Sequence, residues 1–173
     1  NGITLAGFAN GESNAQLGTV TYTGTSQGAK NAGTYTLSGT AVSGLGYKLN
    51  YTEGSLTVNK ATLALAMADQ TKVYDGTNTA SIKAGDITAK GVTVGTTTES
   101  VSINALTGTF NSKNVANATS SSASVSVADV NTATAANGLD LSNYNLPSTV
   151  TNNSSSITKA TLALAMADQT KVY

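Results

Sequence analysis

The stretch KATLALAMADQTKVY, residues 60–74, determines how the chain is organised, because the same fifteen residues return unchanged at residues 159–173. We call these two segments the first copy and the second copy. Self-similarity at a fixed period is the sequence signature of a repeat array. The second copy starts 99 positions after the first, and it ends where the first continues with Asp75 and Gly76. We therefore expect two units and an overhang, cut from a longer protein with further repeats.

The repeated segment itself is predicted to form a strand. Ala, Leu and Met all favour helices, so propensity alone would make "ATLALAMA" helical. Leu63, Leu65 and Met67 are spaced two apart, however, which spreads them around a helix but places them on one face of a strand. We therefore predict a strand whose three large apolar side chains lie in the core.

Alternation of apolar and polar residues predicts further strands, each with one buried and one wet face. These segments are bounded by Gly, Asn or other turn residues and cover residues 18–24, 33–39, 47–51, 55–60, 101–110 and 122–130. Short strands with frequent turn signals favour a sandwich over βαβ units. No Pro-rich or Gly/Ser linker separates residues 55–60 from the first copy, so neighbouring units would be joined stiffly. The predicted fold is all-β, with tandem small β-sandwich-like repeat units arranged end to end.

The composition excludes several classes of partner and chemistry. Charged residues make up 10% of the chain and the net charge is zero, against roughly 25% charged residues in average globular chains. No basic patch can dominate such a surface, so we expect neither nucleic acid nor membrane as a partner. Without Cys or His, the chain has no disulfide, thiolate nucleophile, zinc–thiolate site or Ser-His-Asp triad. Pro147 is the only proline, and this favours order over disorder.

The "KVYDGT" sequence, residues 72–77, has two interpretations. Asp75 could act as a ligand or base, but Asp-Gly is also a strong signal for a tight turn. We favour the turn, with Gly76 at positive φ and Tyr74 packed where its strand ends. By the same argument Phe110 is predicted to lie in the core and Asn114 in a turn.

Other candidate sites are weaker. Asp129, Asn131 and Asp140 resemble part of a calcium loop, but Ala133 occupies the position where a third oxygen ligand belongs. A glycosidase would need two carboxylates facing a cleft about 5–10 Å apart, with sugar-binding aromatics around it. The chain has no Trp and only two Phe. We therefore predict that the chain is not an enzyme and has no catalytic residues, no metal site and no cofactor. The glutamates considered for such a pair are Glu12, Glu53 and Glu99.

Two covalent modifications stay open as weaker hypotheses. An isopeptide bond between a lysine and an Asn or Asp side chain would draw on Lys60, Lys72 or Lys113, although a lysine near a strand edge is more commonly a solvated guard against edge pairing. N-glycosylation sequons occur at Asn50, Asn117, Asn152 and Asn153.

Several of these sequences resemble known repeat families. Residues 7–63, with "GFANGES", "LGTVTYTGTSQGAKNAGTYTLSG" and "YKLNYTEGSLTVNKATL", resemble the C-terminal part of an MBG-type repeat that lacks its opening strands. The sequence that follows is similar to a YDG-type repeat. The matching sequences are "KVYDGT" at 72–77, "GTFNSKNVANA" at 108–118, "LSNYNL" at 141–146 and "SSITKATL" at 155–162. We accordingly expect domains at residues 1–60 and 61–159, with residues 160–173 as the first strand of the next repeat.

The resemblance implies a function. Both repeat types occur in giant secreted bacterial adhesins similar to filamentous haemagglutinin, where they form a shaft that carries an adhesive region away from the cell surface. We therefore expect a non-catalytic, extracellular stalk segment used in attachment or biofilm formation. It would be monomeric and contact mainly the neighbouring repeats of its own chain.

The alternative is a module that binds a glycan or matrix polysaccharide weakly and gains avidity by repetition. It would present a cluster of exposed tyrosines, although alternating strand tyrosines are more commonly in the core. The tyrosines in question are Tyr22, Tyr35, Tyr47, Tyr51 and Tyr144.

Overall fold

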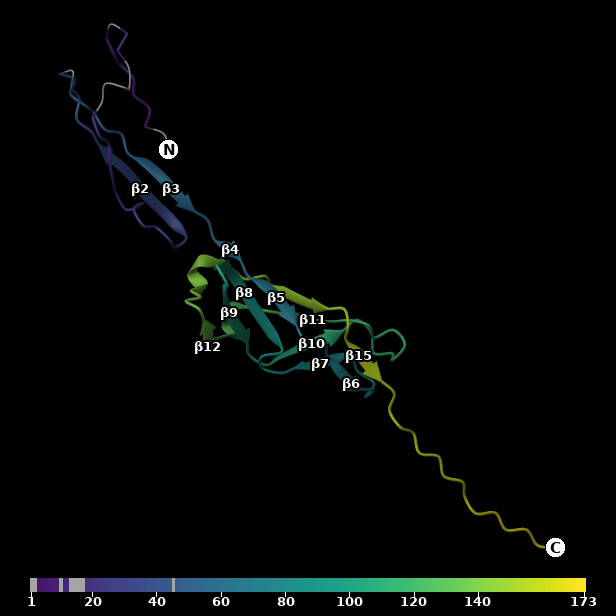
Figure 1. The fold of residues 1–173 in the computed structure, drawn as a ribbon. Helices are drawn as coiled ribbons and strands as arrows, with labels where there is room; N and C mark the ends of the chain where they lie inside the picture. Colours follow the sequence, from purple (N-terminus) through teal and green to yellow (C-terminus); the bar gives the residue numbers. More distant parts are fainter. Residues whose placement is uncertain (1–2, 10, 13–17, 45) are drawn as a thin grey trace. The chain divides into compact units, whose positions relative to one another are not determined.

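The computed structural model describes residues 3–9, 11–12, 18–44 and 46–173 (Figure 1). The chain divides into two compact units, which we call unit 1 (Asn1–Lys60) and unit 2 (Ala61–Tyr173). Both contain β-strands, and no α-helix occurs in the part of the chain that the structure describes. The all-β prediction is therefore confirmed, while the tandem arrangement of units remains a prediction.

Unit 2 contains two four-stranded antiparallel sheets. The first has the order β12-β9-β8-β5 and is formed by β5 (Ala64–Met67), β8 (Ile87–Val94), β9 (Thr97–Ile103) and β12 (Val130–Ala136). The second has the order β14-β11-β10-β7 and is formed by β7 (Thr79–Ile82), β10 (Leu106–Phe110), β11 (Ser121–Ser124) and β14 (Thr149–Asn152). Two short 3-10 helices, η2 (Val127–Asp129) and η3 (Leu141–Asn143), lie between strands.

Two short parallel pairs join the beginning of unit 2 to its end. β4 (Ala61–Thr62) pairs with β13 (Tyr144–Asn145), and β6 (Thr71–Val73) pairs with β15 (Ser156–Thr158). Backbone hydrogen bonds extend both pairs: Leu63 N donates to Asn145 O over 3.0 Å, and Tyr74 N donates to Thr158 O over 2.8 Å. The first copy is therefore held by strands that come almost at the end of the unit.

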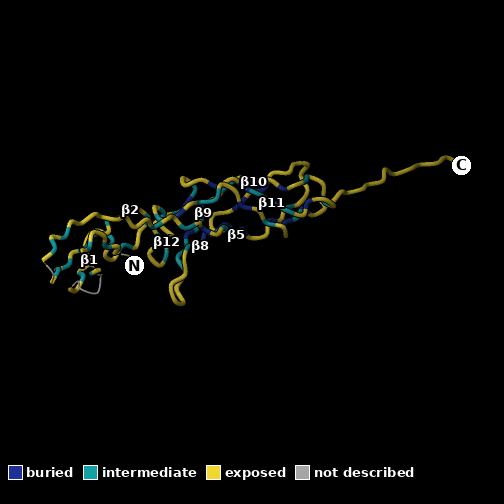
Figure 2. Tube along the Cα trace, turned by 90° about the horizontal axis from the view of Figure 1, so that it is seen from above, coloured by how far each residue is buried: buried dark blue, intermediate teal, exposed yellow. Residues whose placement is uncertain are grey.

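The core of unit 2 lies between its two sheets, where the tube in Figure 2 is dark blue. Alternate residues of the strands point into it, as their period of two requires. Ile87 and Ile103 come from one sheet, Ile82 and Phe110 from the other, and each is at most 2% exposed. Burying each of these side chains stabilises the fold by about 1.5–3 kcal/mol. The prediction for Phe110 is confirmed.

The first copy forms three short strands, β4, β5 and β6, in place of the single strand predicted. Leu63 and Met67 are buried and Leu65 is half-buried against the same core, so the assignment to one face is confirmed. The break after Met67 follows from its partners. β5 pairs with β8 from Ala64↔Lys90 to Met67↔Ile87, whereas β6 pairs with β15.

A buried polar network fixes this change of partner. Ser155 Oγ accepts a hydrogen bond from Gln70 N over 3.1 Å and lies 2.7 Å from Ser121 Oγ. The Nδ2 atom of Asn152 donates to Met67 O over 2.8 Å. Gln70, Ser121 and Ser155 are all at least 93% buried, and a buried polar group without a partner would cost about 1–3 kcal/mol. The network therefore specifies where the first copy bends.

The described part of unit 1 forms a three-stranded antiparallel sheet, β1-β2-β3, of β1 (Thr21–Thr23), β2 (Gly33–Thr40) and β3 (Gly54–Val58). None of its described residues is fully buried. Apolar side chains of the sheet stay accessible, with Leu37 41% and Leu56 39% exposed. The core described above therefore belongs to unit 2.

The second copy has neither strand nor burial. Residues 160–173 form no regular element, and all of them are exposed, which Figure 2 shows as a yellow tube. Leu162, Leu164 and Met166 are at least 90% exposed.

Three predicted strands are corrected. Residues 47–51 form no strand, because no strand among the described residues pairs with them. The hydroxyl groups of Tyr47 and Tyr51 instead accept hydrogen bonds from the backbone N–H groups of Ala9 and Ala41. Residues 122–130 leave β11 after Ser124 and enter η2, where the Asp129 carboxylate accepts from the backbone N–H of Ser126 over 2.8 Å. The predicted strand 101–110 is divided between β9 and β10.

Candidate functional site

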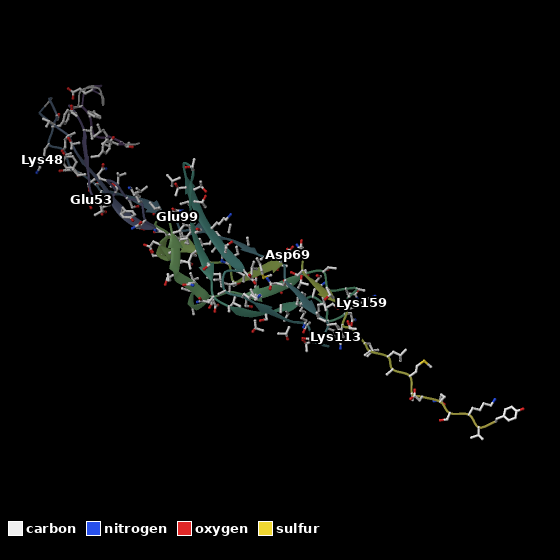
Figure 3. The ribbon with its side chains drawn as sticks, turned by 60° about the horizontal axis from the view of Figure 1, so that its bottom comes forward. Lys48, Glu53, Asp69, Glu99, Lys113 and Lys159 are labelled. Atoms are coloured by element: carbon white, nitrogen blue, oxygen red, sulfur yellow. The ribbon has the colours of Figure 1, made fainter. Side chains whose placement is uncertain are left out.

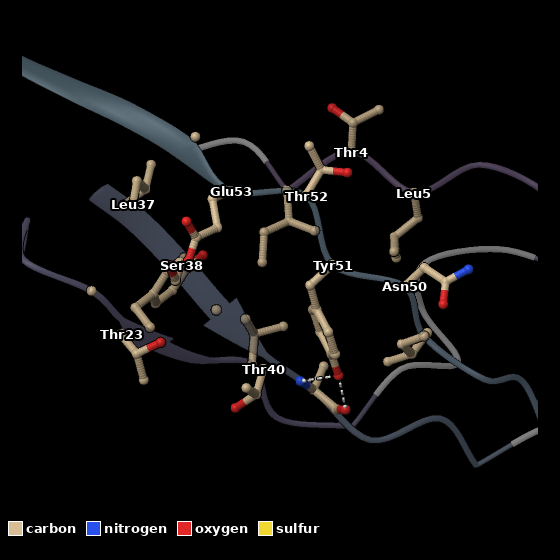
Figure 4. Close-up of a pocket in the computed structure, with 18 residues that line it drawn as sticks. Thr4, Leu5, Thr23, Leu37, Ser38, Thr40, Asn50, Tyr51, Thr52 and Glu53 are labelled. Atoms are coloured by element: carbon tan, nitrogen blue, oxygen red, sulfur yellow. Dashed lines mark hydrogen bonds between the residues drawn. The ribbon is translucent and has the colours of Figure 1, made fainter. Parts of the chain in front are cut away.

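A groove on unit 1 is a candidate binding site. It has a volume of about 950 Å³ and is lined by residues 3–5, β1, β2 and residues 49–54 (Figure 4). Its walls combine apolar side chains such as Leu5 and Leu37 with the hydroxyl groups of several threonines. Concave sites with apolar walls and a few polar groups are the usual form of a ligand site.

Two of the predicted tyrosines, Tyr22 and Tyr51, line this groove. Tyr22 is 47% and Tyr51 55% exposed. The hydroxyl group of Tyr51 donates to Ala41 O over 2.8 Å and accepts from Ala41 N over 3.2 Å. Its ring is therefore held in place, while Tyr22 offers an exposed ring on which an apolar sugar face could stack.

The groove also contains one carboxylate. Ser38 Oγ donates a hydrogen bond to Glu53 Oε1 over 2.8 Å, and both side chains line the groove. Glu53 is exposed, so its second oxygen is accessible as an acceptor. The arrangement can accept hydrogen bonds from ligand hydroxyl groups.

The other three predicted tyrosines do not line this groove, and each is hydrogen-bonded within its own unit. Tyr144 is 6% exposed; its hydroxyl donates to the Glu99 carboxylate and accepts from Val92 N over 3.0 Å. Tyr47 in unit 1 makes the same contacts, donating to Glu12 and accepting from Ala9 N over 3.0 Å. Tyr35, half-buried, donates to Asn31 O over 2.7 Å.

The two tyrosine–glutamate pairs were not predicted from the sequence, although the sequence contains a signal for them. Tyr47 and Tyr144 each precede a Lys-Ala-Thr-Leu sequence, which begins at position 60 and at position 159 respectively.

The surroundings of the two tyrosines shift their pKa values. Burial is the larger cause that raises the pKa of Tyr144, and the hydrogen bond to Glu99 is the next. The bond to Glu12 raises the pKa of Tyr47. Gly91 makes room for the Tyr144 hydroxyl group, since a Cβ atom at that position would lie 2.5 Å from it.

The "KVYDGT" segment leaves β6 after Val73 and bends at Gly76, which has the predicted positive φ of +83°. Asp75 Oδ1 accepts from Lys72 Nζ over 2.8 Å and from Thr77 N over 2.9 Å. The bond from Lys72 is the main reason that the pKa of Asp75 is lowered to about 2. Tyr74, predicted to pack at the strand end, is instead 41% exposed. Asn114 begins a turn closed by Asn117 N, which donates to Asn114 O.

The carboxylates considered for calcium or for a glycosidase pair each have hydrogen-bond partners of their own. Figure 3 shows Glu53 and Glu99 on different units, and Glu12, Glu53 and Glu99 each accept a hydrogen bond from a hydroxyl group. Asp129 bonds to Ser126, and Asp140 accepts from Ser142 N over 2.9 Å. Asn131 lies in β12. In the described part of the chain, no three acidic side chains form a metal-binding group.

The residues proposed for modification differ in their surroundings. Lys72 is engaged with Asp75 and lies 5.8 Å above the Phe110 ring, whereas Lys60 and Lys113 are exposed. Asn50, Asn117 and Asn153 are exposed, but the Nδ2 atom of Asn152 already donates to Met67 O and Asp69. A sugar on Asn152 would break the attachment of the first copy.

Comparisons with known proteins give one match. The YDG domain family matches residues 58–152, which include both sheets and the first copy. No curated protein and no solved structure matches the chain. Within the described residues, no helix is long and apolar enough to cross a membrane.

Proposed function

The chain belongs to the YDG domain family, and from this we propose that it is a non-catalytic structural segment of a secreted bacterial adhesin. It acts as a stiff stalk at the extracellular cell surface, in attachment or biofilm formation. The observation that supports this proposal best is the unchanged recurrence of residues 60–74 at residues 159–173. A spacer tolerates and needs such repetition, whereas an active site does not.

The role of the first copy within unit 2 agrees with this proposal. Its strands β4 and β6 pair with β13 and β15, so residues from the start of the unit close the end of the same unit. The side chains of Leu63, Met67 and Gln70 are buried in this arrangement, so these positions tolerate few other residues. Selection for a sound structural unit then explains why these positions return in the second copy.

The chemistry of the described surface also suits a stalk. The only ion pair found among the described side chains is Lys72–Asp75, and the Glu12 and Glu99 carboxylates accept hydrogen bonds from tyrosines. Hydroxyl and amide groups bind water and keep such a surface hydrated. They carry no net charge, so they offer no charged patch to a partner. We infer that the segment's partners are neighbouring repeats, with no catalytic group and no cofactor involved.

Solution scattering and a binding screen on the intact chain test the proposal. A rigid, extended particle that binds no glycan, as monomer or as artificial multimer, supports a stalk. Saturable binding to a biofilm polysaccharide that strengthens with valency contradicts the pure spacer.

The groove of unit 1 supports one alternative, a weak glycan-binding module. Its exposed Tyr22 ring and the Glu53 carboxylate are the groups that a sugar would contact. Tyr22→Ala should then lower binding at least tenfold. Tyr74→Ala, which removes a tyrosine of similar exposure from unit 2, is the matched control and should leave binding unchanged. Equal affinity of both variants and the wild type would eliminate the groove as the glycan site.

A further inference from the structure

One turn of unit 2 has an uncommon backbone conformation. Asn137, at φ +60°, is the only non-glycine residue with a positive φ among those that the structure describes, and Gly138 follows it at +82°. Leu139 N donates to Ala136 O over 3.3 Å and closes the turn. Positive φ at both central residues is the signature of a type I′ turn, for which Asn-Gly is a preferred sequence. This Asn-Gly turn follows directly on β12, which ends at Ala136.

The turn contains an electrophile and a nucleophile that are adjacent in the chain. The electrophile is the amide carbon Cγ of Asn137, and the nucleophile is the backbone nitrogen of Gly138. Gly138 has no side chain to obstruct attack by its nitrogen, and its N–H donates to no acceptor in the described part of the chain. Asn137 is exposed, so water reaches the site.

The side chain of Asn137 also connects two strands. Its Nδ2 atom donates to Thr98 O over 2.7 Å. This bond joins the end of β12 to the start of β9, its neighbour in the sheet. Glu99, the residue after Thr98, accepts the hydrogen bond from Tyr144. A change at Asn137 therefore acts at the part of β9 where the Tyr144–Glu99 pair lies.

We propose that Asn137 is a site of spontaneous modification, at which this turn converts asparagine into aspartate and isoaspartate. The nitrogen of Gly138 forms a bond to Cγ of Asn137, the Cγ–Nδ2 bond breaks, and the amide leaves as ammonia with the proton from Gly138 N. Water then opens the cyclic imide. Hydrolysis at Cγ gives aspartate, and hydrolysis at the backbone carbonyl carbon gives isoaspartate. The net change is a gain of water and a loss of ammonia, and it does not depend on the stalk proposal.

The product cannot make the bond that Asn137 makes. A carboxylate has only acceptor oxygens, so it places a negative charge beside Thr98 O in place of a donor. Isoaspartate also lengthens the backbone of the turn by a methylene group. Both products therefore release the end of β12 from β9. Each event also adds a negative charge to a chain whose net charge is zero.

Two other sites in unit 2 lack the combination found at Asn137. Asn153 is exposed, but the nitrogen of the next residue, Ser154, donates to Asn152 Oδ1 over 2.7 Å. Asp75 precedes a glycine at positive φ, but its carboxylate is ionised at neutral pH and is a poor electrophile. Neither site should react at the rate of Asn137.

Peptide mapping by mass spectrometry tests the proposal on the intact chain, held at mildly alkaline pH for increasing times. Position 137 should gain the mass difference between water and ammonia at least tenfold faster than position 153. Mapping also separates position 137 from the Asn-Gly pairs at 1–2 and 10–11. A synthetic peptide of residues 133–142 gives the rate without the fold. Conversion of the peptide without conversion of the intact chain would show that the fold protects the site, and would overturn the proposal.

Two variants test the structural consequence. Asn137→Asp has the charge of the product, and Asn137→Gly keeps a residue that accepts positive φ but has no amide to react. The backbone amides of residues 97–100 should exchange hydrogen at least threefold faster in both variants than in the unmodified chain, because both lack the bond to Thr98 O. An aged wild-type sample should approach the exchange of Asn137→Asp. Exchange equal to that of the fresh wild type in both variants would refute the release of β12 from β9.

Discussion

The first and second copies have one sequence and two structures. Residues 61–73 of the first copy contain β4, β5 and β6, with Leu63 only 1% exposed. In the second copy, Leu162 has the same neighbours in sequence and is 94% exposed. Local propensity is identical in the two segments, so the difference comes from the strands available to pair with them. Strand formation here is a property of the partners more than of the segment.

The partners of the first copy come from distant positions in the sequence. β8 follows it, while β13, Asn152 and β15 lie at the far end of unit 2. These contacts close long loops, and closing a long loop costs conformational entropy. Only the packing and hydrogen bonds of the complete unit offset this cost.

The largest difference is expected at the first leucine. Leu63→Ala should lower the free energy of unfolding of unit 2 by about 2–5 kcal/mol, because it leaves a cavity in a packed core. Leu162→Ala should change it by less than about 0.5 kcal/mol, because an exposed side chain loses no packing. Urea denaturation of the intact chain, followed through the environment of Tyr144, measures both. Equal effects would mean that the second copy is also packed.

A smaller difference is expected at the buried glutamine. Gln70→Ala removes the amide that contacts Ala68 O and Asp86, and should destabilise unit 2 by about 1–3 kcal/mol. Gln169→Ala, the same change in the exposed copy, should be silent. Hydrogen exchange of the β6 amides gives an independent measure, since they should open more readily only in the first variant. Unchanged protection would show that the backbone bond from Gln70 N to Ser155 is sufficient.

Alkaline pH should weaken the unit that encloses the first copy. The pKa of Tyr144 is raised in the folded state by burial and by Glu99, so the unfolded chain loses this proton first. The stabilisation is complete below the unfolded pKa of about 10 and is lost as the pH rises from there through the folded pKa. Urea midpoints measured across this window should fall in the wild type. The fall should be smaller in Tyr144→Phe, and identical slopes would contradict the assignment.

The smallest effect is expected from the turn after the first copy. The pKa of Asp75 is about 2, so its contribution is present above the unfolded value near 4 and is lost as the pH falls from about 4 to about 2. The carboxyl-carbon NMR shift of Asp75 should follow this titration. Lys72→Gln removes the main cause and should raise the pKa towards 4. A wild-type value near 4 would mean that the ion pair does not persist in solution.

The sequence predicted what depends on periodicity and turn chemistry. The burial of Leu63, Met67 and Phe110 follows from alternation, and the turn at Gly76 follows from Asp-Gly. The groove was not predictable, since it depends on which tyrosines stay exposed. Tyr22 and Tyr144 both lie in short alternating or turn-bounded segments, yet one is 47% and the other 6% exposed.

Long-range polar contacts also could not be predicted from the sequence. The partner of Gln70 is Ser155, 85 positions away, and that of Glu99 is Tyr144, 45 positions away. Neither has a local spacing rule, because sheet pairing brings them together only after the topology is set. The division of the first copy into three strands has the same cause, since its pairing changes from β8 to β15.

The parallel pairing of β6 with β15 has a mechanical consequence. Tension between Ala61 and Thr158 pulls β6 back towards its N-terminal end and β15 forward towards its C-terminal end. Because the strands are parallel, this force slides one along the other, and the hydrogen bonds in the register Ser156↔Thr71 to Thr158↔Val73 bear the load together. An antiparallel hairpin pulled at its two ends would instead open one bond at a time. Unit 2 therefore resists extension most strongly where the first copy pairs with β15.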